Sequence, residues 1–83
     1  MNIIKYALAT EKSIRLMESE NKLVFVVDIK SNKKQIKEDL EKSFDVKIDA
    51  VKTVITPKGK KKAYVQFSQE TPAIDVATKL GLM

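Results

Sequence analysis

The chain has 83 residues and a formal net charge of +5 at pH 7, a length that fits one domain, 1–83, and is too short for a deep active-site cleft. It contains no cysteine, histidine or tryptophan, which excludes disulfides, thiolate nucleophiles, the usual zinc sites and imidazole bases. A basic surface favours polyanionic partners, and no stretch approaches the roughly 20 apolar residues of a membrane span, so we expect a cytoplasmic protein without metal or cofactor.

The first thirty residues predict a strand, a helix and a second strand. A short strand is expected at 3–7, and Thr10 is placed to cap a helix with Ile14 and Met17 on one face. The run KLVFVVDI at 22–29 is β-branched and aromatic and alternates between two faces, which predicts a central strand. Its inward positions would be Leu23, Phe25, Val27 and Ile29.

The middle of the chain predicts a helix and a hairpin. In SNKKQIKEDLEKSF, Asn32 is the expected N-cap and Gln35 completes a variant of the capping box. The next strand alternates from Val46 and shifts phase at Val51, as a bulge would cause, before a turn at 57–59 leads into a return strand. The expected core positions are Ile36, Leu40 and Phe44 of the helix, and Ala63, Val65 and Phe67 of the return strand, which leaves Lys62, Tyr64, Gln66 and Ser68 facing outward.

The last helix is predicted in TPAIDVATKLG, with Thr71 as N-cap, Pro72 at the first helical position and Gly81 beyond the helix end. The resulting order is β-α-β-α-β-β-α. We therefore expect an α+β fold, in which a four-stranded, mostly antiparallel sheet packs with about three helices.

Positive charge is concentrated in the middle of the chain, where 12 lysines face six acidic residues between Lys22 and Ala63. The hairpin segment TPKGKKK has four lysines and no acid, whereas the lysines of helix 33–44 are interleaved with acids. An ammonium group suits phosphate oxygens better than base edges, so we expect backbone-dominated nucleic-acid binding driven by counterion release. The alternative is a solvated hairpin tip that discourages edge pairing of the sheet.

The stretch KKKAYVQF at 60–67 partly matches the RNP1 pattern of RNA-recognition motifs. The matching positions are Lys60, Ala63, Tyr64, Val65 and Phe67. However, Lys61 replaces a glycine, and Lys62 replaces one of the aromatic residues on which bases stack. A free RNA-recognition-type or other nucleic-acid-binding regulator is therefore an alternative function.

An enzyme is a further alternative, using Asp28, Glu38 or Asp49 together with a lysine. Isolated carboxylates on strands and helices are usually solvated, and these spacings do not pair them. The chain lacks cysteine, histidine and paired carboxylates, which disfavours an enzyme.

Four segments, ALATEKS, FVVDIKSNKKQIK, VKIDAVKT and KGKKKAYVQF, occur in the order found in a known family. The chain resembles the L-twenty-three family of large-subunit ribosomal proteins over nearly its whole length, and its short hairpin resembles the archaeal branch. The resemblance implies a structural protein that binds 23S rRNA at the outer rim of the polypeptide exit tunnel. It also implies the ribosomal protein numbered twenty-nine as a neighbour, and a docking site for the signal recognition particle and nascent-chain factors.

The resemblance also implies which residues bind rRNA, although simple helix capping is an alternative role for Thr10 and Asn32. Where the family often has Val-Asn-Thr, this chain has lysine at position 52, which reaches phosphate but lacks the paired donor and acceptor of an amide. With so few residues between Ile55 and Lys62, we expect no extension into the tunnel of the bacterial kind. The implied set is Thr10, Lys12, Ser13, Asn32, Lys33, Lys34, Lys52, Thr53, Lys58, Lys60, Lys61, Lys62 and Tyr64.

Overall fold

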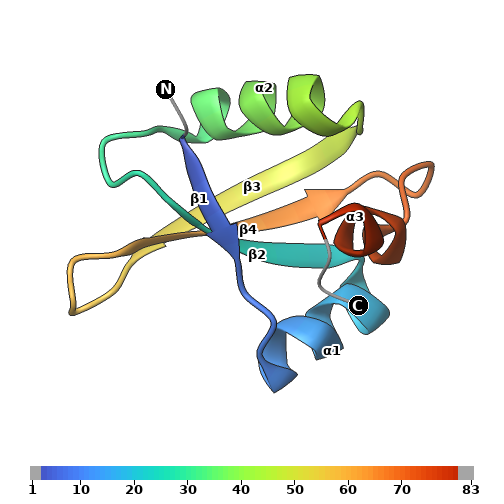
Figure 1. Cartoon of the computed structure of the whole chain (residues 1–83), viewed down its shortest axis with the longest axis horizontal. Helices are drawn as coiled ribbons and strands as arrows, with labels where there is room; N and C mark the ends of the chain where they lie inside the picture. The colour runs from blue at the N-terminus through green and yellow to red at the C-terminus, as the bar shows by residue number, and fades with distance from the viewer. Residues whose placement is uncertain (1–2, 81–83) are drawn as a thin grey trace.

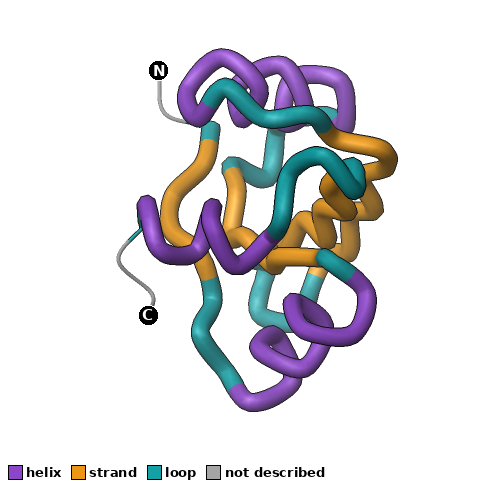
Figure 2. Tube along the Cα trace, turned by 90° about the vertical axis from the view of Figure 1, so that its right-hand side faces the viewer, coloured by secondary structure: helices purple, strands orange, loops and turns teal. Residues whose placement is uncertain are grey.

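The computed structural model describes residues 3–80 and contains a four-stranded sheet in the order β1-β2-β4-β3, with all neighbouring strands antiparallel. The elements are β1 (Ile4–Ala7), α1 (Glu11–Glu20), β2 (Lys22–Val27), α2 (Lys33–Phe44), β3 (Ile48–Ile55), β4 (Lys61–Phe67) and α3 (Ala73–Lys79). The predicted α+β class and element order are therefore confirmed. Figure 1 shows α2 above the sheet and α1 below it, and the side view in Figure 2 also shows the strands between these two helices.

The core lies against one face of the two central strands, β2 and β4. Phe25 of β2 and Val65 of β4 are completely buried, and Ile36 and Leu40 of α2 close over them with no exposed surface. Burial of such side chains is the main favourable term in folding, at about 1.5–3 kcal/mol each. The buried cluster comprises Met17, Leu23, Phe25, Val27, Ile36, Leu40, Val46, Ile48, Ala63, Val65, Phe67, Ala73, Val76 and Ala77.

The predicted capping of the first two helices is confirmed. The Asn32 side-chain oxygen accepts from the Gln35 N–H at 2.8 Å, and the Gln35 side-chain oxygen accepts from the Asn32 N–H at 3.0 Å. The hydroxyl oxygen of Thr10 accepts from the Ser13 N–H at 3.2 Å. Each bond satisfies a donor that the first turn of a helix leaves without an intrahelical partner.

One predicted core position is wrong. Ile29 lies outside β2 and is 45% exposed, because the strand ends at Val27 and the chain turns, with the Ser31 N–H donating to the Asp28 carbonyl at 3.0 Å. Ile14 is 38% exposed, because α1 turns Ser13 and Met17 inward instead. The apolar pattern of α1 alone did not indicate that a serine would face the interior.

The β3–β4 hairpin agrees with the prediction. Its register shifts between Ile48 and Ala50, which places the bulge slightly before the expected phase change. At the turn, the Thr56 carbonyl accepts from the Gly59 N–H at 2.9 Å, and the Thr56 N–H donates to the Lys60 carbonyl at 2.7 Å. Gly59 has φ +78°, a left-handed conformation that glycine adopts without steric cost.

The prediction that Thr71 caps α3 is wrong. Pro72 precedes the helix rather than opening it and makes no side-chain capping bond. The N–H of Ala73 donates instead to Oδ1 of Asn21, at 2.6 Å, while the Thr71 hydroxyl oxygen accepts from the Lys47 N–H at 3.2 Å. The expected end of this helix at Gly81 lies outside the described residues.

Asn21 joins three elements that are far apart in the sequence. It ends α1 in a left-handed conformation, with φ 56° and ψ 41°, and its N–H donates to the Leu16 carbonyl. Its own carbonyl accepts from the Phe67 N–H at 3.1 Å. Its Nδ2 lies 3.1 Å from each of three carbonyl oxygens, those of Phe67, Ser68 and Thr71. One residue therefore fixes the end of α1 through its backbone, and the end of β4 and the start of α3 through its side chain.

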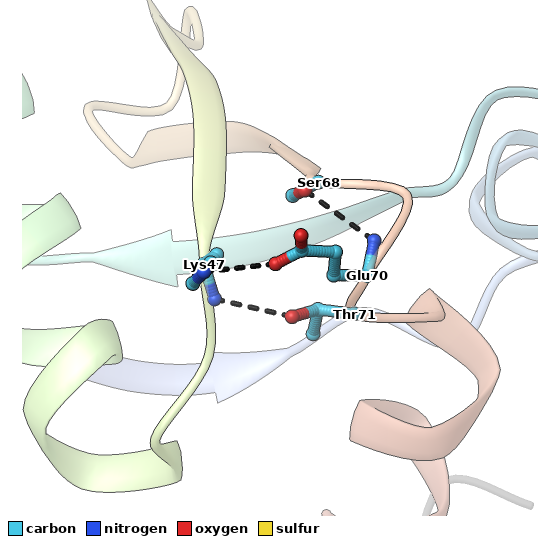
Figure 3. A network of polar contacts seen from close by, with 4 residues as sticks. All are labelled: Lys47, Ser68, Glu70 and Thr71. Carbon is cyan, nitrogen blue, oxygen red and sulfur yellow. Dashed lines mark hydrogen bonds and ion pairs between the residues drawn. The ribbon is translucent and has the colours of Figure 1, made fainter.

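A second polar network holds the turn between β4 and α3 against the start of β3 (Figure 3). The Lys47 ammonium donates to Glu70 Oε2 at 2.8 Å, and the Ser68 hydroxyl oxygen accepts from the Glu70 N–H at 3.4 Å. The hydrogen bond with Glu70 and its negative charge raise the pKa of Lys47, and the same bond and the positive charge of Lys47 lower the pKa of Glu70. Because both groups are exposed, the pair positions the turn and adds little stability.

We predict that Asn21→Ala lowers the free energy of unfolding by about 3 kcal/mol, because it removes the cap of α3 and several half-buried hydrogen bonds and places alanine at positive φ. Urea unfolding of both proteins measures this loss.

Asn21→Gly is the matched control, since glycine accepts the left-handed backbone but lacks the amide. It should recover about 1 kcal/mol relative to alanine. A loss below about 1 kcal/mol for Asn21→Ala would show that the amide does not hold these three elements together.

Candidate nucleic-acid interface

Basic and apolar side chains alternate on the sheet face that is turned away from the core, which we call the open face. On β4, Tyr64 is paired with Val24 of β2 on one side and with Lys52 of β3 on the other. Lys62, two residues earlier, is paired with Val26 and Val54. On β2, β3 and β4 the outward positions of this face are Lys22, Val24, Val26, Ala50, Lys52, Val54, Lys62, Tyr64 and Gln66.

The start of α1 meets this face. A hollow of 100 Å³ lies between them, with Lys12 of α1 on one side and Lys62 and Tyr64 of β4 on the other. The lining residues are Leu8, Thr10, Lys12, Ser13, Leu16, Val24, Lys62 and Tyr64. The fold therefore brings together two predicted groups, TEKS and KKAYV, that are about fifty residues apart in the sequence.

We define the open-face site as Thr10, Lys12, Lys52, Lys62 and Tyr64. Lys12 and Lys52 are exposed, while Lys62 and Tyr64 are half-buried against the sheet. Within residues 3–80, none of these lysines has a carboxylate partner, whereas Lys22 at the border is paired with Glu20 at 3.1 Å. The outward strand positions of the open face include no acid, so the site presents uncompensated positive charge around one aromatic ring.

Ser13 has a structural contact that the sequence did not reveal. It is 4% exposed, and its hydroxyl lies 2.9 Å from the Leu8 carbonyl and 2.8 Å from the Thr10 carbonyl. These contacts fix the loop that leads into α1. The groups that α1 offers to a ligand are the N–H groups of its first turn and the ammonium of Lys12.

The consecutive lysines of the hairpin do not form one cluster, because neighbouring residues of a strand point to opposite faces. The Lys61 ammonium donates to the Ser31 carbonyl, next to the start of α2, whereas Lys62 lies on the open face. Thr53 pairs with Ala63 and faces the core side, away from the open-face site. The exposed members of the predicted set outside this site are Asn32, Lys33 and Lys34 at the start of α2, and Lys58 and Lys60 at the hairpin.

The sequence analysis missed Val24 and Leu16, which form the apolar part of the hollow. The alternation of β2 could have identified Val24, because Leu23 and Phe25 on either side of it were predicted to face the core. Nothing in the sequence indicated that α1 would pack beside it. In the part of the chain that the structure describes, no group of acidic, histidine or cysteine side chains could hold a metal ion, and no helix is long and apolar enough to span a membrane.

The fold and this face define a small α+β protein with one basic sheet surface. A family model described as Ribosomal protein L23 matches residues 2–78, and the chain belongs to this family. It is 47% identical over 81 residues to the large ribosomal subunit protein uL23 of Pyrobaculum aerophilum, an alignment that covers 98% of this chain and 100% of the relative. The chain is thus an archaeal-type structural constituent of the large ribosomal subunit, located on the cytoplasmic ribosome and not an enzyme.

We predict that two neighbouring lysines have separable roles. Lys61→Met should lower the free energy of unfolding by about 1–2 kcal/mol, because it removes a charged hydrogen bond to the Ser31 carbonyl. Lys62→Met should change it by less than about 0.5 kcal/mol. Urea unfolding of the two variants measures the difference, and equal losses would contradict the division of these lysines between two faces.

Proposed function

We propose that the chain binds 23S rRNA of the large subunit through the open-face site. The observation that carries this proposal is the meeting of α1 and β4, which places Lys12 and Lys62 on one hollow beside Tyr64. Lys52 extends the positive charge to the next strand. Since these lysines have no carboxylate partner in the described part of the chain, they are available to phosphate oxygens.

The geometry favours recognition of the RNA backbone over recognition of bases. Lysine donates from a compact ammonium and lacks the planar fork that reads a base edge. Tyr64 is half-buried between Val24 and Lys52, so its ring can stack on one base or its hydroxyl can contact a 2′-hydroxyl. A single ring flanked by valine and lysine is a small stacking surface, which disfavours the alternative of a free RNA-recognition-type regulator.

The exposed residues at the start of α2 and at the hairpin supply a second set of backbone contacts in this proposal. Asn32 is already used in the capping box, so the charge here comes from Lys33 and Lys34. Lys58 and Lys60 are exposed at the hairpin turn. Because α2 packs on the core side of the sheet, Lys33 and Lys34 would contact a different segment of rRNA from the open-face site.

We further propose that the chain lies at the outer rim of the polypeptide exit tunnel, next to the ribosomal protein numbered twenty-nine. There it would help to form the docking site for the signal recognition particle and nascent-chain factors. Membership of the family supports this location. The tight turn at 56–60 supports a position at the rim, since the hairpin has no extension that could reach into the tunnel.

A salt titration of rRNA binding tests the open-face site. We expect Lys52→Ala combined with Lys62→Ala to weaken binding and to reduce the slope of log K against log salt by about 1.5–2, because two phosphate contacts are lost. The control is Lys37→Ala with Lys42→Ala, which removes the same charge from α2 among acidic neighbours. Equal slopes for the two double variants would exclude the open face as the main rRNA contact.

Cross-linking in isolated large subunits tests the proposed location. A photoreactive residue at exposed Lys58 should cross-link to rRNA or to the protein numbered twenty-nine, and subunits bound to the signal recognition particle should give further cross-links to that particle. A photoreactive residue at Lys37 on α2 is the comparison site. Cross-links only to proteins remote from the tunnel exit would refute the location while leaving rRNA binding intact.

A further inference from the structure

The β3–β4 hairpin and the loop after β2 project at the same side of the sheet (Figure 1), and residues from both line a second hollow. Here Ile4, Val27 and Lys61 are paired across neighbouring strands, so the start of β1, the end of β2 and the start of β4 meet. The hollow has a volume of 330 Å³, close to the lower limit of about 300 Å³ for small-molecule sites. Its lining residues are Lys5, Tyr6, Val26, Val27, Asp28, Ile29, Gly59, Lys60 and Lys61.

One part of this lining is apolar and aromatic. Tyr6 lies on the edge strand β1 and is 48% exposed. Ile29, which also lines the hollow, is 45% exposed. Val26, which is paired with Tyr6 across the strands, is buried beneath the hollow. A tyrosine ring above aliphatic side chains provides a surface on which a flat heterocycle can stack.

The other part of the lining is cationic. Lys5 and Lys60 are exposed, and within residues 3–80 neither ammonium has a carboxylate or hydrogen-bond partner. Lys61 donates to the Ser31 carbonyl and holds the loop in place. Asp28 is the one acid of the lining, and its Oδ1 accepts from the Lys30 N–H at 3.0 Å. The two free ammonium groups outweigh this single carboxylate.

Access from the hairpin side is open. An added Cβ at Gly59 would meet no atom within 4 Å apart from those of its chain neighbours, so the space beside this lining residue is open. Its backbone is fixed by the bond to the Thr56 carbonyl. A ligand can therefore enter without a rearrangement of the turn.

We propose that this hollow holds one unstacked nucleotide, with the base against Tyr6 and the phosphate on Lys5 and Lys60. This inference rests on the proposed function, because it takes RNA as the source of the nucleotide, but it assigns a site distinct from the open-face site. An aromatic ring beside two free ammonium groups matches the two parts of a nucleotide. A phosphate alone would leave Tyr6 and Ile29 without a role.

The test is an NMR titration of the folded chain with adenosine 5′-monophosphate, adenosine and inorganic phosphate as separate probes. We expect saturable shifts of the Tyr6, Gly59 and Lys60 amides with the monophosphate, at millimolar concentration. Adenosine should shift the same amides but bind more weakly. Phosphate should act mainly at Lys60. Equal affinity for phosphate and the monophosphate would overturn the proposal, as would the absence of saturable shifts at these amides.

Two variants separate the contributions of base and phosphate. Tyr6→Ala should weaken binding of the monophosphate by about tenfold, as expected for loss of one stacked base, whereas Ile74→Ala, an equally exposed apolar residue on α3, should have no effect. Lys60→Gln should reduce the preference for the monophosphate over adenosine toward one. Unchanged binding of the monophosphate to Tyr6→Ala would contradict the site. If Tyr6→Leu binds as tightly as the original chain, the loss in Tyr6→Ala comes from a disturbed strand and not from the missing ring, which would also contradict the site.

The salt titration of rRNA binding is independent of this result. If the monophosphate fails to bind but the Lys52 and Lys62 variant still loses its salt slope, only the nucleotide site is refuted. If that slope is unchanged while the monophosphate binds, the proposed open-face function is refuted and the hollow remains.

Discussion

The alternation of side chains along β4 is the constraint on which both the core and the candidate interface depend. Ala63, Val65 and Phe67 are buried, so Lys62 and Tyr64 must face the other side of the sheet. A one-residue slip of β4 would place lysines in the core and the apolar side chains in water. Such a slip is very unfavourable, because the free energy gained by burying these side chains would be lost. The free energy that fixes the fold therefore also fixes the register of the charged face.

Asn21 supports this arrangement by holding the end of α1 and the start of α3 at the end of β4. Its amide joins the end of α1 to the carbonyls that follow β4 and to the first N–H of α3. Without such a contact, α1 would be attached to the sheet mainly through Met17 and half-buried Leu16. Since Lys12 reaches the open face only when α1 is held beside β2, the half-buried Asn21 also determines the geometry of the open-face site.

The sequence predicted those features that depend on nearby residues. The capping box of Asn32 and Gln35, the alternation of β4 and the turn at Gly59 each arise from residues a few positions apart, and all are confirmed. The errors concern contacts over long separations. Thr71 has a side chain suited to capping, but Asn21, 52 positions away from Ala73, takes that role. Likewise, alternation along β4 places Lys61 and Lys62 on opposite faces, but no local pattern indicated that Lys61 bonds to the Ser31 carbonyl.

The turn of the hairpin has a consequence for the timing of ribosome assembly. Three hydrogen bonds close it: the Thr56 carbonyl accepts from Gly59, the Thr56 hydroxyl oxygen accepts from the Lys60 N–H at 3.2 Å, and the Thr56 N–H donates to the Lys60 carbonyl. A segment that is already ordered loses little conformational entropy when it meets a partner. The hairpin can thus bind a growing ribosomal particle in the conformation it already has. Its association rate would then depend on diffusion and charge and not on folding at the surface that it contacts.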